Sequence, residues 1–211
     1  LHVIAAGSLP GVVIRKAEIS FPVGKVERLQ MFPMSFEEFL MAIDDGRSLL
    51  EGLSNYDLRR ALPEMYTIPL QNYLKLYYVV GGMPAAVASF VQENDFEKVD
   101  RILKNILLDY GDDFSKHAPP SDIPKLGLIW DSVPKQLAKD NNKFMFSHVK
   151  AGKRAADLED ALQWLFNAGL LHKLECVTNA ELPLSNNANG TVFKVYMSDV
   201  GLLRVKSGID A

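Results

Sequence analysis

Apolar residues recur along most of this chain with the 3.6-residue period of an amphipathic helix. We predict helices over 36–43, 69–80, 123–138 and 153–167, a helix carrying the stripe Val99, Ile102, Leu103, Ile106 and Leu107, and a short element at 146–149. Four runs, at 1–6, 23–31, 171–177 and 192–198, have the continuous or alternating apolar pattern of strands. The expected fold class is therefore mainly α with small β elements.

Capping and breaking residues indicate where several of these helices begin and end. Ser35-Phe36-Glu37-Glu38 has the spacing of a capping box, as does Asn94-Asp95-Phe96-Glu97. Gly81-Gly82 is placed to end the helix over 69–80, and Pro84 can begin the next one. Tyr110-Gly111-Asp112-Asp113 is expected to interrupt the helical pattern, which leaves an acidic cluster at a helix end.

Changes in this pattern divide the chain into four parts, at 1–45, 46–119, 120–203 and 204–211. The first part contains the run Val3-Ile4-Ala5-Ala6, which is apolar on both faces, as are the inner strands of parallel sheets. We expect the other strands of such a sheet to lie N-terminal to Leu1. The second part is helical, and the third has three helices followed by a β-hairpin, which is the order of a winged helix-turn-helix.

Composition and charge argue against a membrane protein, a disulfide-stabilised protein and a protein that binds nucleic acid through its overall charge. The longest apolar stretch, Leu76–Val91, is broken by Gly81-Gly82 and Pro84 and falls short of the roughly 20 residues that span a bilayer, so we expect no membrane contact. Cys176 is the only cysteine, which excludes an internal disulfide and is typical of a cytoplasmic protein. The net charge of -3 means that any contact with nucleic acid must come from a local basic patch.

A search for catalytic motifs excludes several kinds of site. Neither Gly24-Lys25 nor Gly152-Lys153 stands in a phosphate-binding loop, and the four histidines have no metal-ligand spacing, so no metal site is predicted. Ser8 lacks the flanking glycines of a nucleophile elbow. Cys176 lies in a predicted strand and is expected to be a small buried residue.

Five stretches, in this order, resemble a widespread group of prokaryotic AAA-type ATPases: HVIAAGSLPGV, FPVGKVERLQMFPMSFEEFL, YYVVGGMPAAV, KQLAKDNNKFMFSHVKAGKRAADLEDALQWLFNAGLLHKL and FKVYMSDVGLL. The resemblance covers nearly the whole chain, from Leu1 to Leu203. It implies the C-terminal remnant of an ATPase core over 1–45, a helical lid over 46–119 and a winged helix over 120–203. Residues 204–211 would then begin a nuclease-like domain.

The same resemblance implies roles for residues and cofactors. Ser8 ends the strand next to the magnesium-carboxylate strand of that family, so it would be a sensor residue facing the γ-phosphate. ATP and magnesium would be bound by the intact parent protein, in an ATPase core N-terminal to Leu1. Because the phosphate loop and the magnesium carboxylates are not in this sequence, the chain is expected neither to bind a cofactor nor to hydrolyse ATP by itself.

The predicted winged helix has a weak basic patch. Lys150, Lys153 and Arg154 stand where the helix over 153–167 begins and could contact phosphates. Three carboxylates, Asp157, Glu159 and Asp160, follow at once, and the loop over 181–190 has no Lys or Arg. Docking against another domain is therefore favoured over DNA recognition. Three functions stay open: transmission of the nucleotide state of an ATPase, a stand-alone DNA-binding module, and an interaction scaffold.

Overall fold

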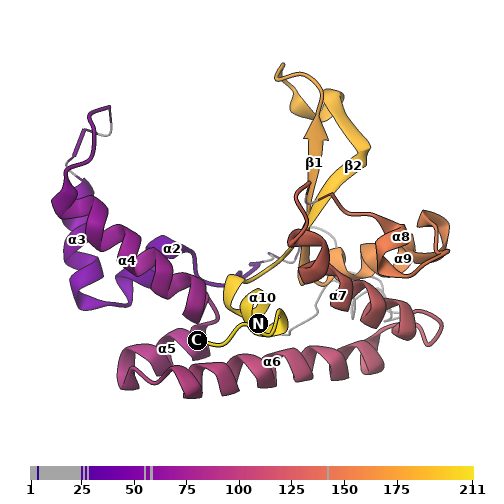
Figure 1. Cartoon of the computed structure of the whole chain (residues 1–211), viewed down its shortest axis with the longest axis horizontal. Coiled ribbons are helices and arrows are strands. Elements are labelled where there is room, and N and C mark those ends of the chain that lie inside the picture. The colour runs from indigo at the N-terminus through magenta and orange to yellow at the C-terminus, as the bar shows by residue number, and fades with distance from the viewer. Residues whose placement is uncertain are drawn as a thin grey trace. The chain divides into compact units, whose positions relative to one another are not determined.

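The structure, a computed structural model, describes residues 29–211 apart from 55, 58 and 142, together with residues 4, 25 and 27. Figure 1 shows that helices dominate, and that one small sheet of two antiparallel strands is present in the part described. The expected fold class, mainly α with small β elements, is confirmed.

The helices and strands follow one another along the chain as labelled in Figure 1. They are α2 (Phe36–Met41), α3 (Asp44–Ser54), α4 (Glu64–Val80), α5 (Pro84–Glu93), α6 (Phe96–His117), α7 (Ile123–Leu137), α8 (Phe146–Val149), α9 (Ala155–Asn167), β1 (Leu171–Val177), the 3₁₀-helix η1 (Leu184–Asn187), β2 (Ala188–Met197) and α10 (Val200–Lys206).

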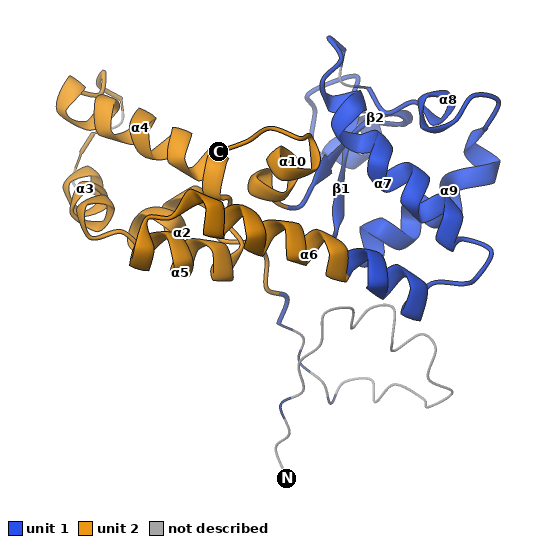
Figure 2. Cartoon of the chain, turned by 60° about the horizontal axis from the view of Figure 1, so that its bottom comes forward, with its two compact units in different colours: residues 1–30, 110–198 blue, residues 31–109, 199–211 orange. Residues whose placement is uncertain are grey.

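The chain forms two compact units, and each unit is built from two separate segments of the sequence (Figure 2). Unit 1 contains Leu1–Gln30 and Tyr110–Ser198, and unit 2 contains Met31–Asp109 and Asp199–Ala211. The predicted boundary at 119 lies between α6 and α7, whereas those at 45 and 203 fall inside α3 and α10. The boundary at 203 is wrong because α10 is a continuous helix that packs on α4 within unit 2.

Unit 2 has a helical core in which aromatic rings contact one another. The Phe39 ring meets Tyr77 edge-on at 5.5 Å between centroids and stacks with Phe90 at 6.3 Å. Fully buried aliphatic side chains from five helices complete this core, namely Leu40, Val80, Val87, Val99, Leu103 and Leu202. Burying such side chains stabilises each by roughly 1.5–3 kcal/mol relative to leaving it exposed.

Unit 1 packs α7 and α9 together and adds a hairpin. Buried side chains from both helices and both strands form its core, among them Leu126, Ile129, Leu158, Leu165, Leu171, Phe193 and Val195. In the hairpin, Leu171 lies opposite Met197 and Glu175 lies opposite Phe193. Cys176 then lies opposite Asn189, so the extra residues 190–192 belong to β2, and β1 continues without interruption.

The predicted signals around α2, α4 and α5 act as expected, whereas the one before α6 acts differently. The capping box at Ser35 is confirmed, since Ser35 N–H donates to Glu38 Oε2 at 2.7 Å and Glu38 N–H donates to Ser35 Oγ at 3.3 Å. Gly81 has a φ of 76° and ends α4 as predicted. At α6 the cap is Asp95, whose Oδ1 accepts from Lys98 N–H, while Asn94 ends α5 in the left-handed conformation.

The predicted interruption at Tyr110-Gly111-Asp112-Asp113 is wrong, because α6 runs through these residues to His117. A β-carbon at Gly111 would meet nothing within 4 Å, and Gly111 has no positive φ, so this glycine lies in a regular helix. The acidic cluster therefore lies along α6 and not at its end. A single glycine weakens a helix by roughly 1 kcal/mol relative to alanine but does not end it.

The predicted strands at 1–6 and 23–31 and the proposed sensor Ser8 fall mainly outside the described residues. Ile4 is described, lies in no strand and is 99% exposed, so its expected burial is not found. The described residues of the second run, at 25, 27 and 29–31, are also in no strand. A strand needs a hydrogen-bonded neighbour, and the described part of the chain offers these runs none.

Candidate functional site

The three residues proposed to contact nucleic acid lie together in unit 1, just before α9. Lys150 and Arg154 are exposed, Lys153 is half-buried, and Arg154 is the N-cap residue of α9. Lys139 extends this basic cluster (Lys139, Lys150, Lys153 and Arg154), and its Nζ lies 3.0 Å from Nδ1 of His148 in α8. The structure thus brings the predicted residues to one segment.

A buried polar chain fixes the loop before α8 against α7. Oε1 of Gln136 accepts from Met145 N–H at 2.7 Å, and its Nε2 donates to Ser132 Oγ at 3.1 Å. The Ser132 hydroxyl donates in turn to Ile129 C=O at 2.8 Å. Since both side chains are buried and every link is made, this loop is held firmly.

The first turn of α9 already has an anionic group. Asp157 Oδ2 accepts from Arg154 N–H at 2.9 Å, and this bond, together with nearby Lys153 and Arg154, lowers the pKa of the Asp157 carboxyl. A helix N-terminus attracts anions through its free N–H groups. A DNA phosphate would therefore approach a position next to an existing carboxylate.

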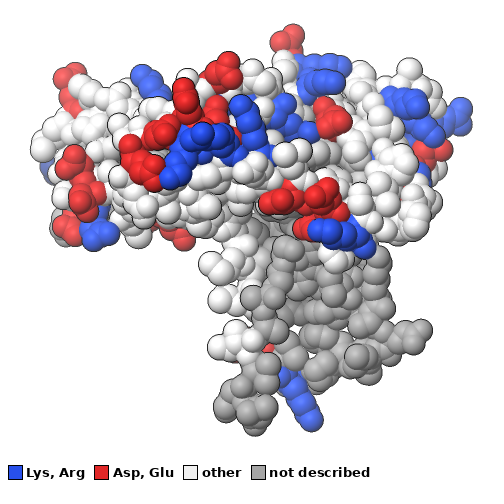
Figure 3. Space-filling model, turned by 90° about the horizontal axis from the view of Figure 1, so that it is seen from below, with Lys and Arg blue, Asp and Glu red and all other residues white. Residues whose placement is uncertain are grey.

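More negative charge covers the outer face of α9. Glu159 and Asp160 are exposed. On the neighbouring helix, Lys125 Nζ forms an ion pair with Asp122 at 2.8 Å, and the charges of Asp160 and Asp157 also raise the pKa of Lys125. Because phosphate contacts need uncompensated positive charge, this face of α9 is poorly suited to the major groove of DNA. Figure 3 likewise shows Lys and Arg mixed with Asp and Glu on the face it draws.

A second candidate site lies in unit 2, where three chain segments meet at one buried carboxylate. We call it the Asp199 junction and define it by Met34, Gly81, Gly82, Asp199 and Gly201. The Asp199 side chain is 3% exposed; its Oδ2 accepts from Gly82 N–H at 2.6 Å, and its Oδ1 accepts from Leu202 N–H at 2.8 Å, which caps α10.

The corner between α4 and α5 is bonded on its other side to the segment before α2. Met34 N–H donates to Gly82 C=O at 2.7 Å, and the Tyr77 hydroxyl donates to Met34 C=O at 2.8 Å. Burial, with the negative charges of Asp199 and Glu38 adding to it, raises the pKa of Tyr77. Tyr77 therefore stays a neutral hydrogen-bond donor.

Glycine is required in this junction because backbones approach closely. A β-carbon on Gly82 would lie 2.1 Å from Met34 O, and one on Gly201 would lie 2.7 Å from Val80 O. Gly81 combines its positive φ with a similar conflict, since its β-carbon would lie 2.5 Å from Asp199 Oδ1. Any side chain at these positions would push the segments apart.

The ionisation of Asp199 is set by two opposing effects. Burial raises the pKa of the Asp199 carboxyl, and the N–H groups of Gly82, Leu202 and Gly201 act against this rise. A buried carboxylate without donors would be strongly destabilising. Asp199 is thus stabilised only while the α4–α5 corner and the start of α10 keep their positions.

A buried arginine anchors the other end of α10. Arg204 is 8% exposed and forms an ion pair with Asp100 in α6. Its Nε donates to Val79 C=O at 2.9 Å, and its Nη1 donates to Ile209 C=O at 2.8 Å. The charge and the hydrogen bonds of the guanidinium are therefore matched. Thus α10 is fixed at its start to the α4–α5 corner through Asp199, and near its end to α4 and α6 through Arg204.

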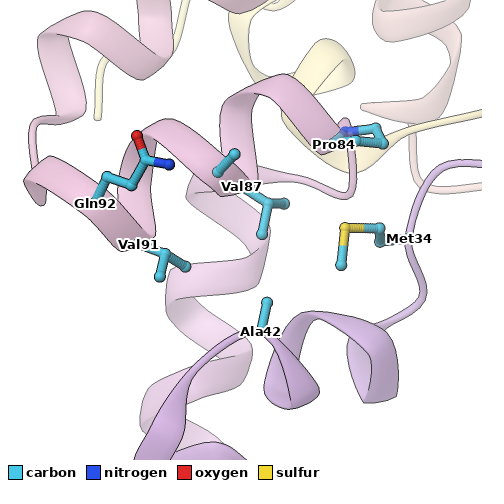
Figure 4. Close-up of a pocket in the computed structure, with 7 residues that line it drawn as sticks. Met34, Ala42, Pro84, Val87, Val91 and Gln92 are labelled. Atoms are coloured by element: carbon cyan, nitrogen blue, oxygen red, sulfur yellow. The ribbon is translucent and has the colours of Figure 1, made fainter.

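The apolar pocket in Figure 4 is a third candidate and lies wholly within unit 2. It has a volume of about 200 Å³ and is lined by Met34, Ala42, Pro84, Val87, Ala88, Val91 and Gln92. This volume is below the roughly 300–1,000 Å³ of typical ligand sites. Gln92 is its one polar lining side chain, so we assign it no chemistry.

Sequence reasoning missed Asp199 and Arg204 as buried polar anchors. An N-cap signal was present, because Asp199 stands directly before the apolar run Val200-Gly201-Leu202-Leu203. The bond from Gly82, 117 positions away, has no local sequence signal. For Cys176 the prediction of burial was wrong. It is exposed because β1 packs against the core only through Leu171.

The described part of the chain was also searched for metal-binding groups and for membrane-spanning helices. We find there no group of three or more His, Cys, Asp or Glu side chains that could bind a metal ion. Among the described helices, none combines the length and the hydropathy that a bilayer-spanning segment requires.

The chain was compared with curated proteins, solved structures and protein-family models. No curated protein and no solved structure matches the chain. One family model matches residues 71–211, which contain α5 to α10 and both anchors of α10. By this match the chain belongs to the family described as Domain of unknown function (DUF8612).

Proposed function

We propose that this chain is the part of an AAA-type ATPase that follows the nucleotide-binding core, and that it transmits the nucleotide state of that core to a winged-helix unit. The resemblance of five ordered motifs supports the first statement. The order α7, α8, α9, β1 and β2 in unit 1 supports the second, because three helices followed by a hairpin form a winged helix.

The observation that carries this proposal is the Asp199 junction. Three of the five motifs contribute to it: the one ending in Phe36-Glu37-Glu38-Phe39-Leu40, the one containing Gly81-Gly82, and the one containing Asp199. Met34 N–H and Gly82 C=O join the first two, and Gly82 N–H and Asp199 join the second to the third. Segments far apart in the sequence thus share one set of buried hydrogen bonds.

The junction is placed to act on the hairpin through the chain itself. Strand β2 ends at Met197, and Asp199 follows two residues later. Because Asp199 is bonded to the α4–α5 corner, a shift of that corner would move the point where the chain passes from β2 into unit 2. A packed, fully bonded junction changes between discrete arrangements and does not deform gradually.

ATP and magnesium would be bound by the preceding core. Among the described residues we find no group of three or more His, Cys, Asp or Glu side chains that could hold the metal ion, and neither Gly-Lys pair of the sequence is a phosphate loop. We therefore assign no step of hydrolysis to this chain. Its part is to hold the α4–α5 corner and the start of α10 together.

Hydrogen exchange tests this function in the protein extended by the residues that precede Leu1 in its reading frame. We expect a non-hydrolysable ATP analogue with magnesium to change the exchange of β2 and α10 amides, and Asp199→Asn to reduce that change. Asp112→Ala, on an exposed position of α6, serves as the control. Nucleotide binding without any change in β2, or tight ATP binding by residues 1–211 alone, would contradict the proposal.

A second candidate function is DNA binding, which the basic cluster before α9 favours. Fluorescence anisotropy with random duplex DNA over a salt series measures it. If Lys150, Lys153 and Arg154 contact phosphates, changing all three to alanine should weaken binding and flatten the salt dependence, by roughly 0.9 in log–log slope per contact. Lys104→Ala, on an exposed position of α6, should leave binding unchanged. Equal binding by the triple variant and the parent excludes this cluster as the interface.

A further inference from the structure

Helix α4 has one face that is exposed from its first turn to its last. We name it the outer face of α4 and define it by the exposed residues of that helix, which are Glu64, Met65, Ile68, Gln71, Asn72, Lys75 and Tyr78. With 3.6 residues per turn, these positions all lie on one side of the helix. The other residues of α4 are wholly or partly buried, and the helix packs on α10, α2, α3 and α5 within unit 2.

The outer face of α4 has the spacing of a seam between two helices. Five of its residues follow one another at intervals of four, three, four and three positions: Glu64, Ile68, Gln71, Lys75 and Tyr78. Coiled coils use this spacing along the line where their helices meet. Met65 flanks the stripe and is 71% exposed, while Ile68 and Tyr78 within it are each 54% exposed. Apolar side chains therefore occupy positions that a second helix would cover.

The two charged residues of the outer face have no ion-pair partner among the residues that the structure describes. These are Glu64 and Lys75, and neither belongs to any of the ion pairs of the chain. They cannot pair with each other within one helix, because eleven positions separate them by about 16 Å along the helix axis. A second α4 that runs antiparallel would bring a Lys75 to each Glu64.

This charge pairing defines one register. When Glu64 lies opposite Lys75 of the second copy, Ile68 lies opposite Gln71 of that copy. Each of these contacts then occurs twice, because the arrangement has a two-fold axis. Two oppositely charged pairs thus close the ends of the seam, and the two Ile68 side chains occupy its middle. Met65 of each copy lies beside Asn72 of the other, along one side of the seam.

The charges disfavour the other ways of pairing this stripe. In a parallel pair with the two helices in register, Glu64 would face Glu64 and Lys75 would face Lys75. In an antiparallel pair shifted by one heptad, Lys75 would face Gln71, and the two Lys75 side chains would lie about 6 Å apart along the seam with no carboxylate opposite them. Like charges this close oppose association, so the register with two Glu64–Lys75 pairs is favoured.

We propose that the outer face of α4 binds the same face of a second copy of this chain, with the two helices antiparallel and with Glu64 of each copy paired to Lys75 of the other. The contact extends over about 21 Å of helix and covers few apolar side chains, so it buries less than the roughly 1,200 Å² of a stable interface. The dimer is therefore weak and concentration-dependent. It includes no residue of the Asp199 junction, so it does not rest on the proposed function.

Disulfide crosslinking of residues 1–211 tests the register. Glu64→Cys and Lys75→Cys are made as separate variants, each in a Cys176→Ser background. We expect a mixture of the two to give a crosslinked dimer under mild oxidation, because facing residues of packed helices are close enough for a disulfide. This mixed dimer keeps one Glu64–Lys75 pair at its other end. Each variant alone should stay uncrosslinked, since its two cysteines would lie about 16 Å apart along the seam.

Charge exchange gives the second measurement, by sedimentation equilibrium. Glu64→Lys or Lys75→Glu alone should weaken the dimer about tenfold, because two ion pairs are lost and like charges then face each other. The double variant Glu64→Lys/Lys75→Glu should restore the dimer, and so should an equimolar mixture of the two single variants. Asp112→Lys makes the same change of charge at an exposed position of α6 and should leave the dimer unchanged.

Three results would overturn the proposal. The first is a chain that stays monomeric at every concentration up to its solubility limit. The second is a dimer in which the mixture of Glu64→Cys and Lys75→Cys fails to crosslink, because its interface then lies elsewhere. The third is a dimer that Glu64→Lys and Asp112→Lys weaken equally, because net charge and not the seam then governs association.

Discussion

The carboxylate of Asp199 accepts a hydrogen bond from the backbone N–H of Gly82, with 2.6 Å between Oδ2 and N, across 117 positions of sequence. This bond joins the cap of α10 to the corner between α4 and α5. It is buried, so its loss would leave polar groups without water to replace the partner. Both the packing of unit 2 and the proposed transmission of the nucleotide state depend on it.

Removing the Asp199 carboxylate should destabilise the protein strongly. Asp199→Ala leaves the N–H groups of Gly82 and Leu202 without an acceptor, and we expect the free energy of unfolding in urea to fall by about 2–4 kcal/mol. Asp95→Ala is the matched control, since Asp95 caps α6 at a less buried site, and it should cost about 1 kcal/mol. Equal losses in the two variants would show that Asp199 acts only as a helix cap.

The ionisation of Asp199 should make stability depend on pH in a defined direction. Because burial raises its pKa in the folded state, the folded protein holds this proton more tightly than the unfolded chain. The resulting stabilisation is complete below the unfolded pKa of about 3.9 and is lost as pH rises through the higher folded pKa. Relative to Asp199→Asn, which cannot ionise here, the parent should therefore lose stability as pH rises through this range. Urea unfolding of both proteins at a series of pH values measures the free energy of unfolding of the parent minus that of Asp199→Asn. A rise of this quantity with pH would be inconsistent with a raised pKa.

Two glycines should respond to alanine with opposite signs. Gly82→Ala places a β-carbon 2.1 Å from Met34 O and should destabilise unit 2 by about 3 kcal/mol or more, because backbone must move. Gly111→Ala meets nothing within 4 Å inside α6 and should stabilise the protein by about 0.5–1 kcal/mol. Thermal and urea unfolding compare the two variants. A tolerated Gly82→Ala would mean that the corner is not closely packed.

The buried pair of Arg204 and Asp100 should be costly to break on one side. Arg204→Met leaves the Asp100 carboxylate without its partner, and we expect a loss of about 3–5 kcal/mol. Adding Asp100→Leu should recover part of that loss, because no unpaired charge then remains. The exposed pair of Arg60 and Asp57, 3.9 Å apart, is the control, and Arg60→Met should change stability by less than about 0.5 kcal/mol. If Arg204→Met behaves like Arg60→Met, the pair does not anchor α10.

Local signals made much of the fold predictable. Ser35 and Glu38 gave the start of α2, Gly81 and Pro84 gave the corner between α4 and α5, and the strand over 171–177 matches β1 at both ends. These features depend on residues within a few positions of one another. The same reasoning put the cap of α6 one residue too early, at Asn94, because Asn and Asp can both take that place.

Long-range packing was not predictable in this way. Nothing near Asp199 indicates that its second acceptor oxygen meets Gly82, and nothing near Arg204 indicates Asp100. Cys176 shows the converse, since an apolar-rich strand suggested burial, whereas β1 packs against the core at Leu171 alone. The proposed roles of Ser8 and of the basic cluster stay predictions, because the first lies outside the described residues and the second awaits a binding measurement.

The division of unit 2 into Met31–Asp109 and Asp199–Ala211 has a consequence for synthesis on the ribosome. Residues 110–198 interrupt unit 2 in the sequence, so its last helix emerges only after the whole inserted segment has been translated. Until then the Gly82 N–H has no carboxylate to bind, and α4 has no α10 to cover it. A nascent chain should thus complete the inserted segment before unit 2 can be completed, and a stop codon ahead of Asp199 would leave unit 2 without its last helix.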